Sequence, residues 1–277
     1  MKKAILIVSF GTTYPETRQK NIAAITRQVR ALYPDALVAE AVSSTIVRNA
    51  MKKREHIDAK SPEEGLLWLK EQGATHIVVF PTHVIDGIEN YRVKRVVEEY
   101  KTDFKQITVA DALLAKSCDY TNVAKALWES LKEKVGNAPL ILMGHGTEHT
   151  EDSSYAVMEQ ALQAYAQQPV YIATVEGKRT IADVIAQMQS EDIVNVRVVV
   201  APFMLVAGDH AHNDMAGMED SFASLLKENG YLPECILRGL GEYPAVREIY
   251  LSHLQKAAGT LFADITTKNR TGILYAI

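Results

Sequence analysis

Three side chains of metal-binding type recur at similar places in the sequence. His145, Glu176 and His210 each lie at or just beyond the end of a short apolar run that has the composition of a buried strand. The carboxyl ends of parallel strands meet at one edge of a sheet, and open α/β folds bind their ligands there. Two imidazoles and a carboxylate suit a borderline divalent metal such as cobalt, iron, nickel or zinc. The positions therefore predict a mixed nitrogen and oxygen metal site, although no local ligand spacing of the HExxH kind is present.

An internal repeat supports this placement. Ser9-Phe10-Gly11-Thr12 follows an apolar run near the amino terminus, and Gly144-His145-Gly146-Thr147 follows a similar run in the second half. Glu89 and His210 lie at equal distances from the proline that ends the preceding apolar run. Equivalent positions of two duplicated halves face each other across the cleft between them, where ligands commonly bind. The repeat therefore predicts that Glu89 faces the metal site.

Other polar residues surround the second histidine. His212 is two residues from His210 and is either a second ligand or a solvated loop residue. The interpretation as a solvated loop residue is favoured. Asp209 and Asp214 either accept a hydrogen bond from an imidazole or cap a helix that begins near Met215, and capping is the safer reading for Asp214. His149 is placed on the rim of the site, and His83 follows a strand from which it could point into the cleft.

The elements that must position these residues alternate along the chain. Short β-branched runs alternate with amphipathic segments, which is typical of parallel sheets joined by crossover helices. The spacing predicts one helix over 15–33, a helix capped by Ser61-Pro62-Glu63-Glu64, and a long helix ending at Gly136-Asn137. We expect an α/β fold with an N-terminal domain over 1–136 and a C-terminal domain over 137–277 that carries the main metal-binding histidines. Further strands are predicted near 77–80, 107–109, 140–143, 170–175, 196–201 and 235–237. Further helices are predicted near 153–167, 180–189, 215–229 and 244–258. The last segment, 259–277, is either a tail packed on the first domain or loose.

Composition excludes several classes of protein. The chain has 277 residues, 47% of them hydrophobic, and a formal net charge of -4, which gives no general attraction to nucleic acid or to anionic membranes. Cys118 and Cys235 lie far apart and form no CxxC motif, so a disulfide framework is not expected. The apolar run after Met1 is too short for a signal peptide, and the expectation is a soluble cytoplasmic protein. The GxxxxGK[ST], GxGxxG and GxSxG motifs are absent, which argues against ATP-driven, dehydrogenase and α/β-hydrolase chemistry.

Taken together, four motifs resemble a known family. They are Ser9–Thr13, the loop 81–89, Gly144–His149 and Gly208–Met215. The chain resembles the anaerobic, ATP-independent sirohydrochlorin cobaltochelatases, which are class II chelatases related to ferrochelatase. The resemblance implies two similar α/β domains, each a parallel sheet flanked by helices, with a tetrapyrrole bound in the interdomain cleft. It also implies metal binding by His145, Glu176 and His210, and an acidic residue, Glu89, facing that site.

The chemistry of metal insertion fits these side chains. The enzyme must strip water from the ion and remove two pyrrole protons, so a neutral imidazole can serve as both ligand and proton acceptor. We assign that double role to His145. Glu89 would either relay protons or stabilise a cationic intermediate. Binding of the tetrapyrrole is assigned to Ser9, Phe10 and Thr12. Its carboxylates require local cations, and the candidates by position are Arg48, Arg92, Lys94, Arg95, Lys178 and Arg179, with Arg92 and Lys178 preferred.

The resulting prediction is a lyase that inserts Co2+, its substrate metal, into sirohydrochlorin on the way to cobalamin, without a nucleotide cofactor. The partners are a tetrapyrrole and a divalent metal, with no nucleic acid and no membrane. Insertion of Fe2+ or Ni2+ into a related tetrapyrrole is an alternative, because the donor set selects weakly among these metals. A carrier that binds metal or tetrapyrrole without turnover is another, and a degenerate, regulatory member of the family is a third. The sequence leaves the formation of a homo-oligomer open.

Overall fold

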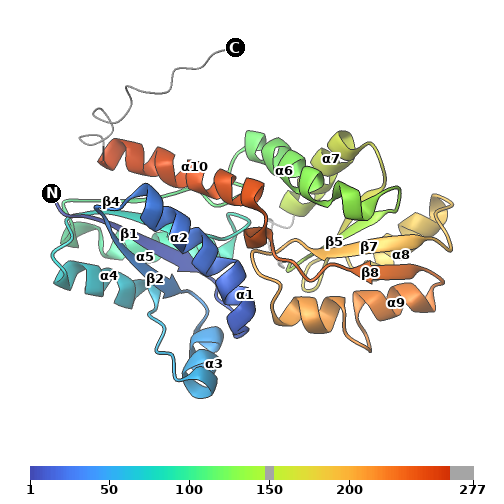
Figure 1. Cartoon of the computed structure of the whole chain (residues 1–277), viewed down its shortest axis with the longest axis horizontal. Coiled ribbons are helices and arrows are strands. Elements are labelled where there is room, and N and C mark those ends of the chain that lie inside the picture. Colours follow the sequence, from blue (N-terminus) through green and yellow to red (C-terminus); the bar gives the residue numbers. More distant parts are fainter. Residues whose placement is uncertain (147–152, 263–277) are drawn as a thin grey trace, which may run out of the picture.

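The computed structural model of the protein describes residues 1–146 and 153–262. Two four-stranded parallel sheets lie end to end along the long axis of the molecule (Figure 1), with strand orders β2-β1-β3-β4 and β6-β5-β7-β8. The two orders are the same once the strands are counted from the start of each half. This confirms the predicted fold class, two similar units in which a parallel sheet is flanked by helices.

The two central strands of the first sheet are buried on both faces, whereas its edge strands are partly exposed. It contains β1 (Lys3–Ser9), β2 (Leu37–Val42), β3 (His76–Pro81) and β4 (Gln106–Val109). All seven residues of β1 are buried, which is why its sequence is a continuous apolar run rather than an alternating one. The helices of this half are α1 (Pro15–Lys20), α2 (Ile22–Leu32), α3 (Thr45–Glu55), α4 (Pro62–Glu71), α5 (Ile88–Glu99) and α6 (Ser117–Val135), with the 3-10 turn η1 (Lys101–Asp103).

The expected single helix over 15–33 is wrong, because the chain breaks at Asn21. Asn21 is fully buried, and its side-chain amide donates to the carbonyl of Thr17 at 2.8 Å. A side chain that bonds to the local backbone competes with the helical ladder and favours a break. By contrast, the predicted cap is confirmed: Ser61 and Glu64 form reciprocal side-chain to backbone hydrogen bonds at the start of α4.

The second half repeats the scheme with β5 (Leu140–Gly144), β6 (Val170–Thr174), β7 (Arg197–Pro202) and β8 (Leu232–Cys235). The helices are α7 (Ser153–Ala166), α8 (Ile181–Ser190), the π-helical turn η3 (Ala211–Met215), α9 (Phe222–Glu228), the 3-10 turn η4 (Leu240–Glu242) and α10 (Pro244–Leu261). The expected helix over 215–229 is therefore confined to α9, which Ser221 caps. The last strand also lies earlier than the expected 235–237.

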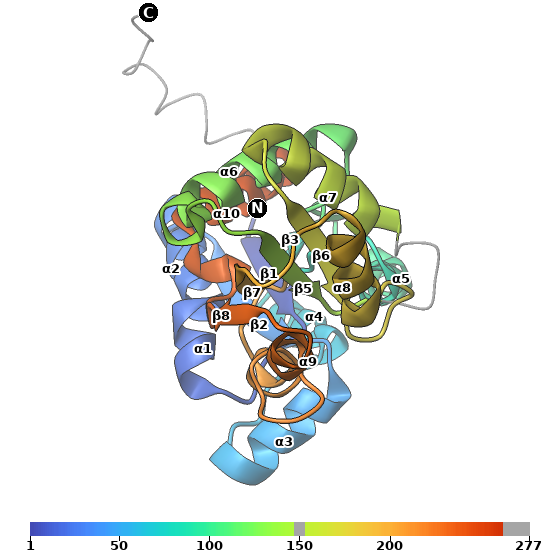
Figure 2. The same ribbon diagram turned by 90° about the vertical axis from the view of Figure 1, so that its right-hand side faces the viewer.

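The last helix, α10, ties the two halves together. Although it follows the second sheet in the chain, it lies along the first (Figure 1) and contacts β3, β4 and α6. Figure 2 shows α6 and α10 together above the sheets. The hydroxyl of Tyr250 on α10 donates to the carbonyl of Thr82 at 3.0 Å. One buried cluster includes Phe80 of the first half, Leu140 of the second, and Tyr250, so the two sheets share a continuous apolar core.

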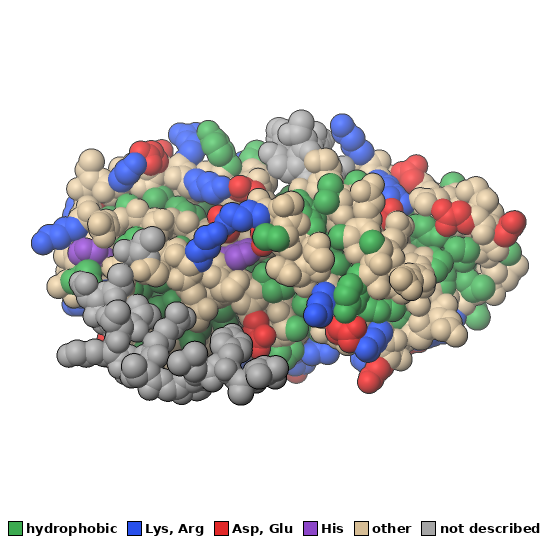
Figure 3. Space-filling model, turned by 90° about the horizontal axis from the view of Figure 1, so that it is seen from above, with side chains coloured by type: hydrophobic (Ala, Val, Ile, Leu, Met, Phe, Trp, Pro, Cys, Tyr) green, Lys and Arg blue, Asp and Glu red, His purple; other side chains and the backbone are tan. Residues whose placement is uncertain are grey.

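The helices and the surface bear on the expected partners. Within the described ranges, none of the helices combines the length and hydropathy that a bilayer crossing requires. On the face seen in Figure 3, Lys and Arg side chains are interspersed with Asp and Glu. The expected division of the chain into two domains at 136/137 stays a prediction. The expectation for the tail beyond residue 262 lies outside the described residues.

Candidate metal centre

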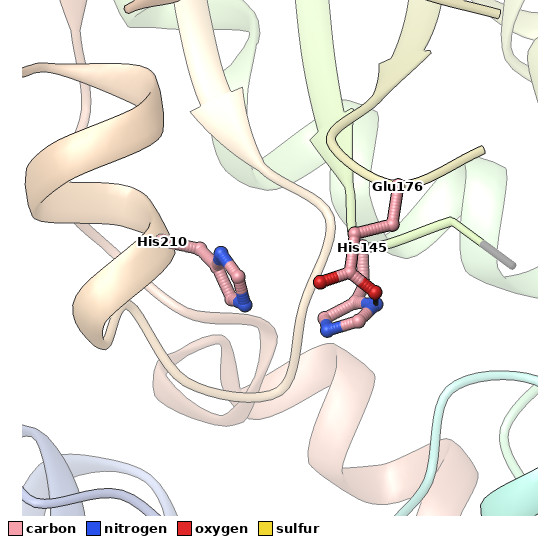
Figure 4. Close-up of side chains that lie close together, drawn as sticks. All are labelled: His145, Glu176 and His210. Atoms are coloured by element: carbon pink, nitrogen blue, oxygen red, sulfur yellow. Dashed lines mark ion pairs between the residues drawn. The ribbon is translucent and has the colours of Figure 1, made fainter.

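The structure brings His145, Glu176 and His210 together. One ligand atom from each side chain lies within 4.8 Å of the other two. In Figure 4, His145 and Glu176 come from neighbouring loops of the second sheet, and His210 approaches from a separate turn. Within residues 1–146 and 153–262, this is the one group of three or more His, Cys, Asp or Glu side chains arranged so closely. The three residues predicted as metal ligands are therefore neighbours in space.

The parallel ladder between β5 and β6 places Glu176 beside His145. The pairing continues past the strand ends, because the amide of Val175 donates to the carbonyl of Gly144 at 3.1 Å and the amide of Glu176 to that of His145 at 2.8 Å. Nδ1 of His145 then lies 3.7 Å from Oε2 of Glu176. The extended ladder explains why a histidine and a glutamate far apart in sequence share one edge.

Gly146 permits this approach. Its φ is +87°, and a Cβ at this position would collide with the backbone nitrogen and Cα of Gly177. A side chain here would be strained by the positive φ and would push the turn that carries Glu176 away from His145. The glycine that follows the histidine in the repeated motif is thus a geometric requirement of the site.

His210 enters from the connection between β7 and η3. Its ring centroid is 4.8 Å from that of His145, with an angle of 86° between the planes. Its Nδ1 lies 2.7 Å from Oδ2 of Asp214, four residues further on. The capping role favoured for Asp214 is wrong, because the helix it was expected to cap begins at Phe222 behind Ser221. Asp214 holds the imidazole of His210 instead.

Both histidines keep one nitrogen available. Nδ1 of His145 lies 3.1 Å from the carbonyl oxygen of Gly146. A carbonyl only accepts, so this bond places the proton on Nδ1 and leaves the lone pair on Nε2. The Asp214 carboxylate has the same effect on His210. The side chains of His145, Glu176 and His210 are 38%, 60% and 34% exposed. Three donors on a half-exposed edge would leave coordination positions open, as in reactive rather than structural metal sites.

The loop after β1 borders this group from the first half. The ring of Phe10 is 41% exposed and lies 6.4 Å from the ring of His145. Ser9 and Thr12 are buried. The Oγ1 of Thr12 accepts a hydrogen bond from the amide of Tyr14 at 3.2 Å. The carboxyl edges of β1 and β5 therefore meet, and Phe10 is the member of the predicted trio that presents its side chain.

Glu89 is not part of the close group. It lies in the first turn of α5, and its carboxylate pairs with Arg92 one turn later. Arg92 is exposed, and Lys178 is exposed in the turn just after Glu176. The structure thus places Lys178 near a proposed ligand in the chain, while Glu89 and Arg92 engage each other. The roles given to these three residues stay predictions.

Some of the other candidate cations have structural partners. Arg48 donates to the carbonyls of Val42 and Ser43 at 2.6 and 3.0 Å, which closes the end of β2. Arg179 pairs with the buried carboxylate of Glu159 at 2.6 Å. Lys94 pairs with Asp86, and Arg95 with Glu99. Position in the sequence did not distinguish cations used by the fold from those facing solvent.

Three further histidines were singled out by position. His83 lies just past β3, with Nε2 3.5 Å from Oγ of Ser43, and its buried Nδ1 has no hydrogen-bond partner among the described residues. Burial lowers the pKa of His83 to about 4, so its imidazole is neutral at physiological pH. His212 is half-buried and stacks on Tyr14, which corrects the favoured reading of a solvated residue. His149 lies outside the described residues.

Sequence reasoning overlooked Tyr14 altogether. Its ring and hydroxyl contact the segment that carries His210. An available signal was its place directly after the repeated Ser-Phe-Gly-Thr-Thr motif, at the edge where the two halves meet. No sequence pattern, however, pairs Tyr14 with His212, because the two residues come from different halves of the chain.

Comparisons with known proteins agree with this geometry. The sequence model described as cobalt chelatase (CbiK) matches residues 3–259. The "Sirohydrochlorin cobaltochelatase" of Salmonella typhimurium is 33% identical over 258 residues, covering 93% of this chain and 97% of that protein. The "Sirohydrochlorin cobaltochelatase CbiKC" of Nitratidesulfovibrio vulgaris is 32% identical over 267 residues, covering 94% and 92%.

Solved structures support the fold. SirB from Bacillus subtilis with Fe3+ superimposes with a TM-score of 0.65 at 21% identity, covering 94% of this chain and 97% of that one. CbiX, described as the terminal enzyme for biosynthesis of siroheme in denitrifying bacteria, gives a TM-score of 0.55 at 17% identity, covering 92% and 99%. At these identities the likeness shows the shared architecture. The family match spans nearly the whole chain and includes all three clustered residues, so the chain belongs to the cobalt chelatase (CbiK) family.

Proposed function

We propose that the protein is a sirohydrochlorin cobaltochelatase, a lyase that inserts Co2+ into sirohydrochlorin in anaerobic cobalamin biosynthesis without a nucleotide cofactor. The observation that carries the proposal is the open group of His145, Glu176 and His210. Two curated relatives named for this activity match more than nine tenths of the chain. Co2+ is the substrate metal and sirohydrochlorin the organic substrate.

The donor set suits transient binding of the ion. Nε2 of His145, Nε2 of His210 and a carboxylate oxygen of Glu176 would hold Co2+ by three bonds. Imidazole and carboxylate donors accept borderline divalent ions without the near-irreversible affinity of thiolates. The remaining positions would be taken by water and then by the ring nitrogens of the tetrapyrrole. Four converging nitrogens hold a metal more tightly than three separate side chains, so transfer runs toward the macrocycle without ATP.

Insertion also releases two protons, because the free macrocycle carries two pyrrole N–H groups and the product carries none. As the ion moves onto the ring nitrogens, Nε2 of His145 becomes free to accept the two protons in turn. Each proton passes from the half-exposed imidazole to solvent before the next is accepted. Glu89 is proposed as a relay and Phe10 as an apolar contact for the macrocycle. Lys178 and Arg92 are proposed to meet substrate carboxylates, with Ser9 and Thr12 shaping the loop beneath.

The competing readings differ from this one in what they predict. The donor set alone does not separate Co2+ from Fe2+ or Ni2+, and the names of the two curated relatives favour Co2+. A carrier would bind metal or tetrapyrrole without turnover. Exposure of all three donors favours exchange over storage, because a storage site is usually closed by a fourth protein ligand.

The decisive experiment mixes the purified protein with metal-free sirohydrochlorin and limiting Co2+, without ATP, and follows the absorbance change of the macrocycle. We expect many turnovers per protein, and a loss of at least about 100-fold in His145→Ala because one group is both ligand and base. His56→Asn removes an exposed histidine at the end of α3 and should retain full activity. Tight binding without turnover would make the protein a carrier, and absence of tetrapyrrole binding would overturn the proposal.

A further inference from the structure

Tyr14 contacts the chain on both sides of His210. Its hydroxyl lies 3.3 Å from Oδ1 of Asp209, and its ring stacks on His212 with centroids 4.8 Å apart and planes 7° apart. Partial burial and the Asp209 carboxylate raise the pKa of Tyr14 above its ordinary value near 10, so the hydroxyl remains a donor at neutral pH. One residue of the first half thus holds the residue before His210 and the second residue after it.

Neighbouring contacts extend the same junction. The hydroxyl of Thr17 in α1 donates to the carbonyl of Ala207 at 3.2 Å. Thr12 approaches Gly208 so closely that a Cβ on the glycine would lie 3.1 Å from Oγ1 of the threonine. The guanidinium of Arg18 donates to the carbonyl of Thr12 at 3.1 Å. The loop after β1 and the start of α1 therefore pack against residues 207–212.

The segment held by these contacts includes a short π-helical turn. His210 directly precedes η3, a π-helical turn of five residues, Ala211–Met215. Such turns are rare, occur in short pieces and are frequent at functional sites. Asp214 fixes the rotation of the His210 ring from within η3. Within its own half, η3 is anchored by Ala211 and Met215, which are buried in the core of the second sheet. Its His212 faces the first half, where the ring of Tyr14 covers it.

We propose that Tyr14 and His212 form a latch between the two halves that fixes η3 and so positions His210 for metal binding. Both are positioning residues that act through His210. The inference rests on the proposed metal-binding role of His210, and it adds residues that act without touching the ion. His212 works by ring contact rather than as a ligand, because its face is covered by Tyr14 and it is not in the close group of donors.

The test is Co2+ binding to the full-length protein in the absence of tetrapyrrole, followed by the visible absorption of bound Co2+, which reports ligand number and geometry. Tyr14→Ala and His212→Ala should each weaken Co2+ binding about two- to tenfold, the range that corresponds to one aromatic contact. The double variant should bind no more weakly than the weaker single variant, because both changes break the same contact. In turnover assays the KM for Co2+ should rise more than kcat falls.

Conservative variants separate the latch from other roles. His212→Phe keeps a stacking ring and removes both nitrogens, so it should restore the affinity and spectrum of wild type. If it binds Co2+ as poorly as His212→Ala, then His212 is a ligand and the latch is wrong. Additive losses in the double variant, or unchanged Co2+ binding in both single variants, would also overturn it. The control His56→Asn should match wild type in every assay.

The outcome for the latch can be told apart from that for the proposed function. If wild type binds and inserts Co2+ in a manner that requires His145 while the Tyr14 and His212 variants bind as wild type does, only the latch fails. If wild type itself does not bind Co2+ through His145, the proposed function fails and the latch fails with it.

Discussion

At the scale of single residues, the site is set by hydrogen bonds that decide which nitrogen of each imidazole is free. Nδ1 of His145 is hydrogen-bonded to the carbonyl of Gly146 in its own turn. Nδ1 of His210 is hydrogen-bonded to the Asp214 carboxylate on η3. A charged carboxylate supports the opposite nitrogen as a metal ligand more strongly than a neutral carbonyl does. We therefore expect His210 to be the stronger ligand and His145 the group that exchanges metal for a proton.

This difference predicts the effect of Asp214→Asn. The amide can still accept the hydrogen bond but carries no charge, so Co2+ affinity should fall by about 10- to 100-fold, as for other outer partners of metal ligands. Isothermal titration of Co2+ into the metal-free protein measures the loss. Asp35→Asn, a change at an exposed turn residue, serves as the control. Equal affinities for wild type and Asp214→Asn would show that Asp214 does not support the ligand.

His83 gives a pH prediction for stability. Its pKa is about 4 in the folded chain because burial disfavours the charged form, and the Asp86 carboxylate opposes this only in part. In the unfolded chain the pKa returns to near 6.5, so the unfolded state binds more protons between these values. The contribution to stability is complete above pH 6.5 and is lost as pH falls toward 4. After allowance for partial exposure, it amounts to about 2 kcal/mol.

Urea unfolding at pH 7.5 and pH 4.5 tests this contribution by comparing wild type with His83→Gln. Asp86 and the hydroxyl of Ser43, which interact with the ring, are present in both proteins, so the difference isolates the imidazole. The variant should lose less stability on acidification than wild type does. Parallel losses in the two proteins would mean that His83 titrates normally in the folded state.

At the scale of elements, the site is an extension of the sheet. The backbone hydrogen bonds between β5 and β6 continue into the two loops that follow them. The backbone of His145 and Glu176 is therefore fixed by the sheet. His210 lies beyond the end of β7 and is held through η3, by Asp214 and by the buried Ala211 and Met215. The loop after β1 contacts the same segment from the first half. We expect the His145–Glu176 side of the site to be preformed and the His210 side to respond more readily to substitution.

Gly146→Ala tests the preformed side. Strain from the positive φ together with the collision at Gly177 should destabilise the fold by about 1–3 kcal/mol and displace Glu176, with at least about tenfold weaker Co2+ binding expected from loss of one ligand. Gly73→Ala is the matched control, since φ is +76° and nothing lies within 4 Å of its Cβ. Urea unfolding should show a loss in both variants, and Co2+ titration a loss only in Gly146→Ala. Normal Co2+ binding by Gly146→Ala would contradict this account.

At the scale of the whole molecule, the duplicated sheets are held at one relative position by the last helix. α10 belongs by sequence to the second half but packs on the first sheet and on α6. Its residue Leu254 is fully buried in the cluster that spans both halves. The three proposed ligands belong to the second half, whereas Phe10 and Tyr14 approach them and their neighbours from the first half. A helix that fixes the junction between the two halves therefore matters for function.

Leu254→Ala should therefore destabilise both halves together. Removal of a fully buried leucine costs about 2–5 kcal/mol, whereas Leu232→Ala, at a residue that is 67% exposed, should change stability by about 0.5 kcal/mol or less. Hydrogen exchange followed by mass spectrometry should show β1 and β5 losing protection in parallel. Loss confined to one sheet would instead support separately folding domains divided near 136/137.

The sequence by itself determined the features that depend on near neighbours. Continuous apolar runs predicted the buried parallel strands, and Ser61 with Glu64 predicted the start of α4. Because parallel strands all present their carboxyl ends at one edge, the position of His145, Glu176 and His210 after such runs was enough to predict that they meet. The family resemblance rests on the same motifs.

Tertiary structure decided the features that depend on contacts between distant segments. Asn21 breaks the expected helix where it is buried against Gly239 and Gly241 of the second half, a contact that no local pattern contains. The turn η3 ends at Met215, where the expected helix was to begin, and the helix itself starts only at Phe222. Asp214 therefore binds His210 instead of capping a helix. Local propensities differ by only fractions of a kcal/mol per residue, so burial and interdomain hydrogen bonds override them where the two halves meet.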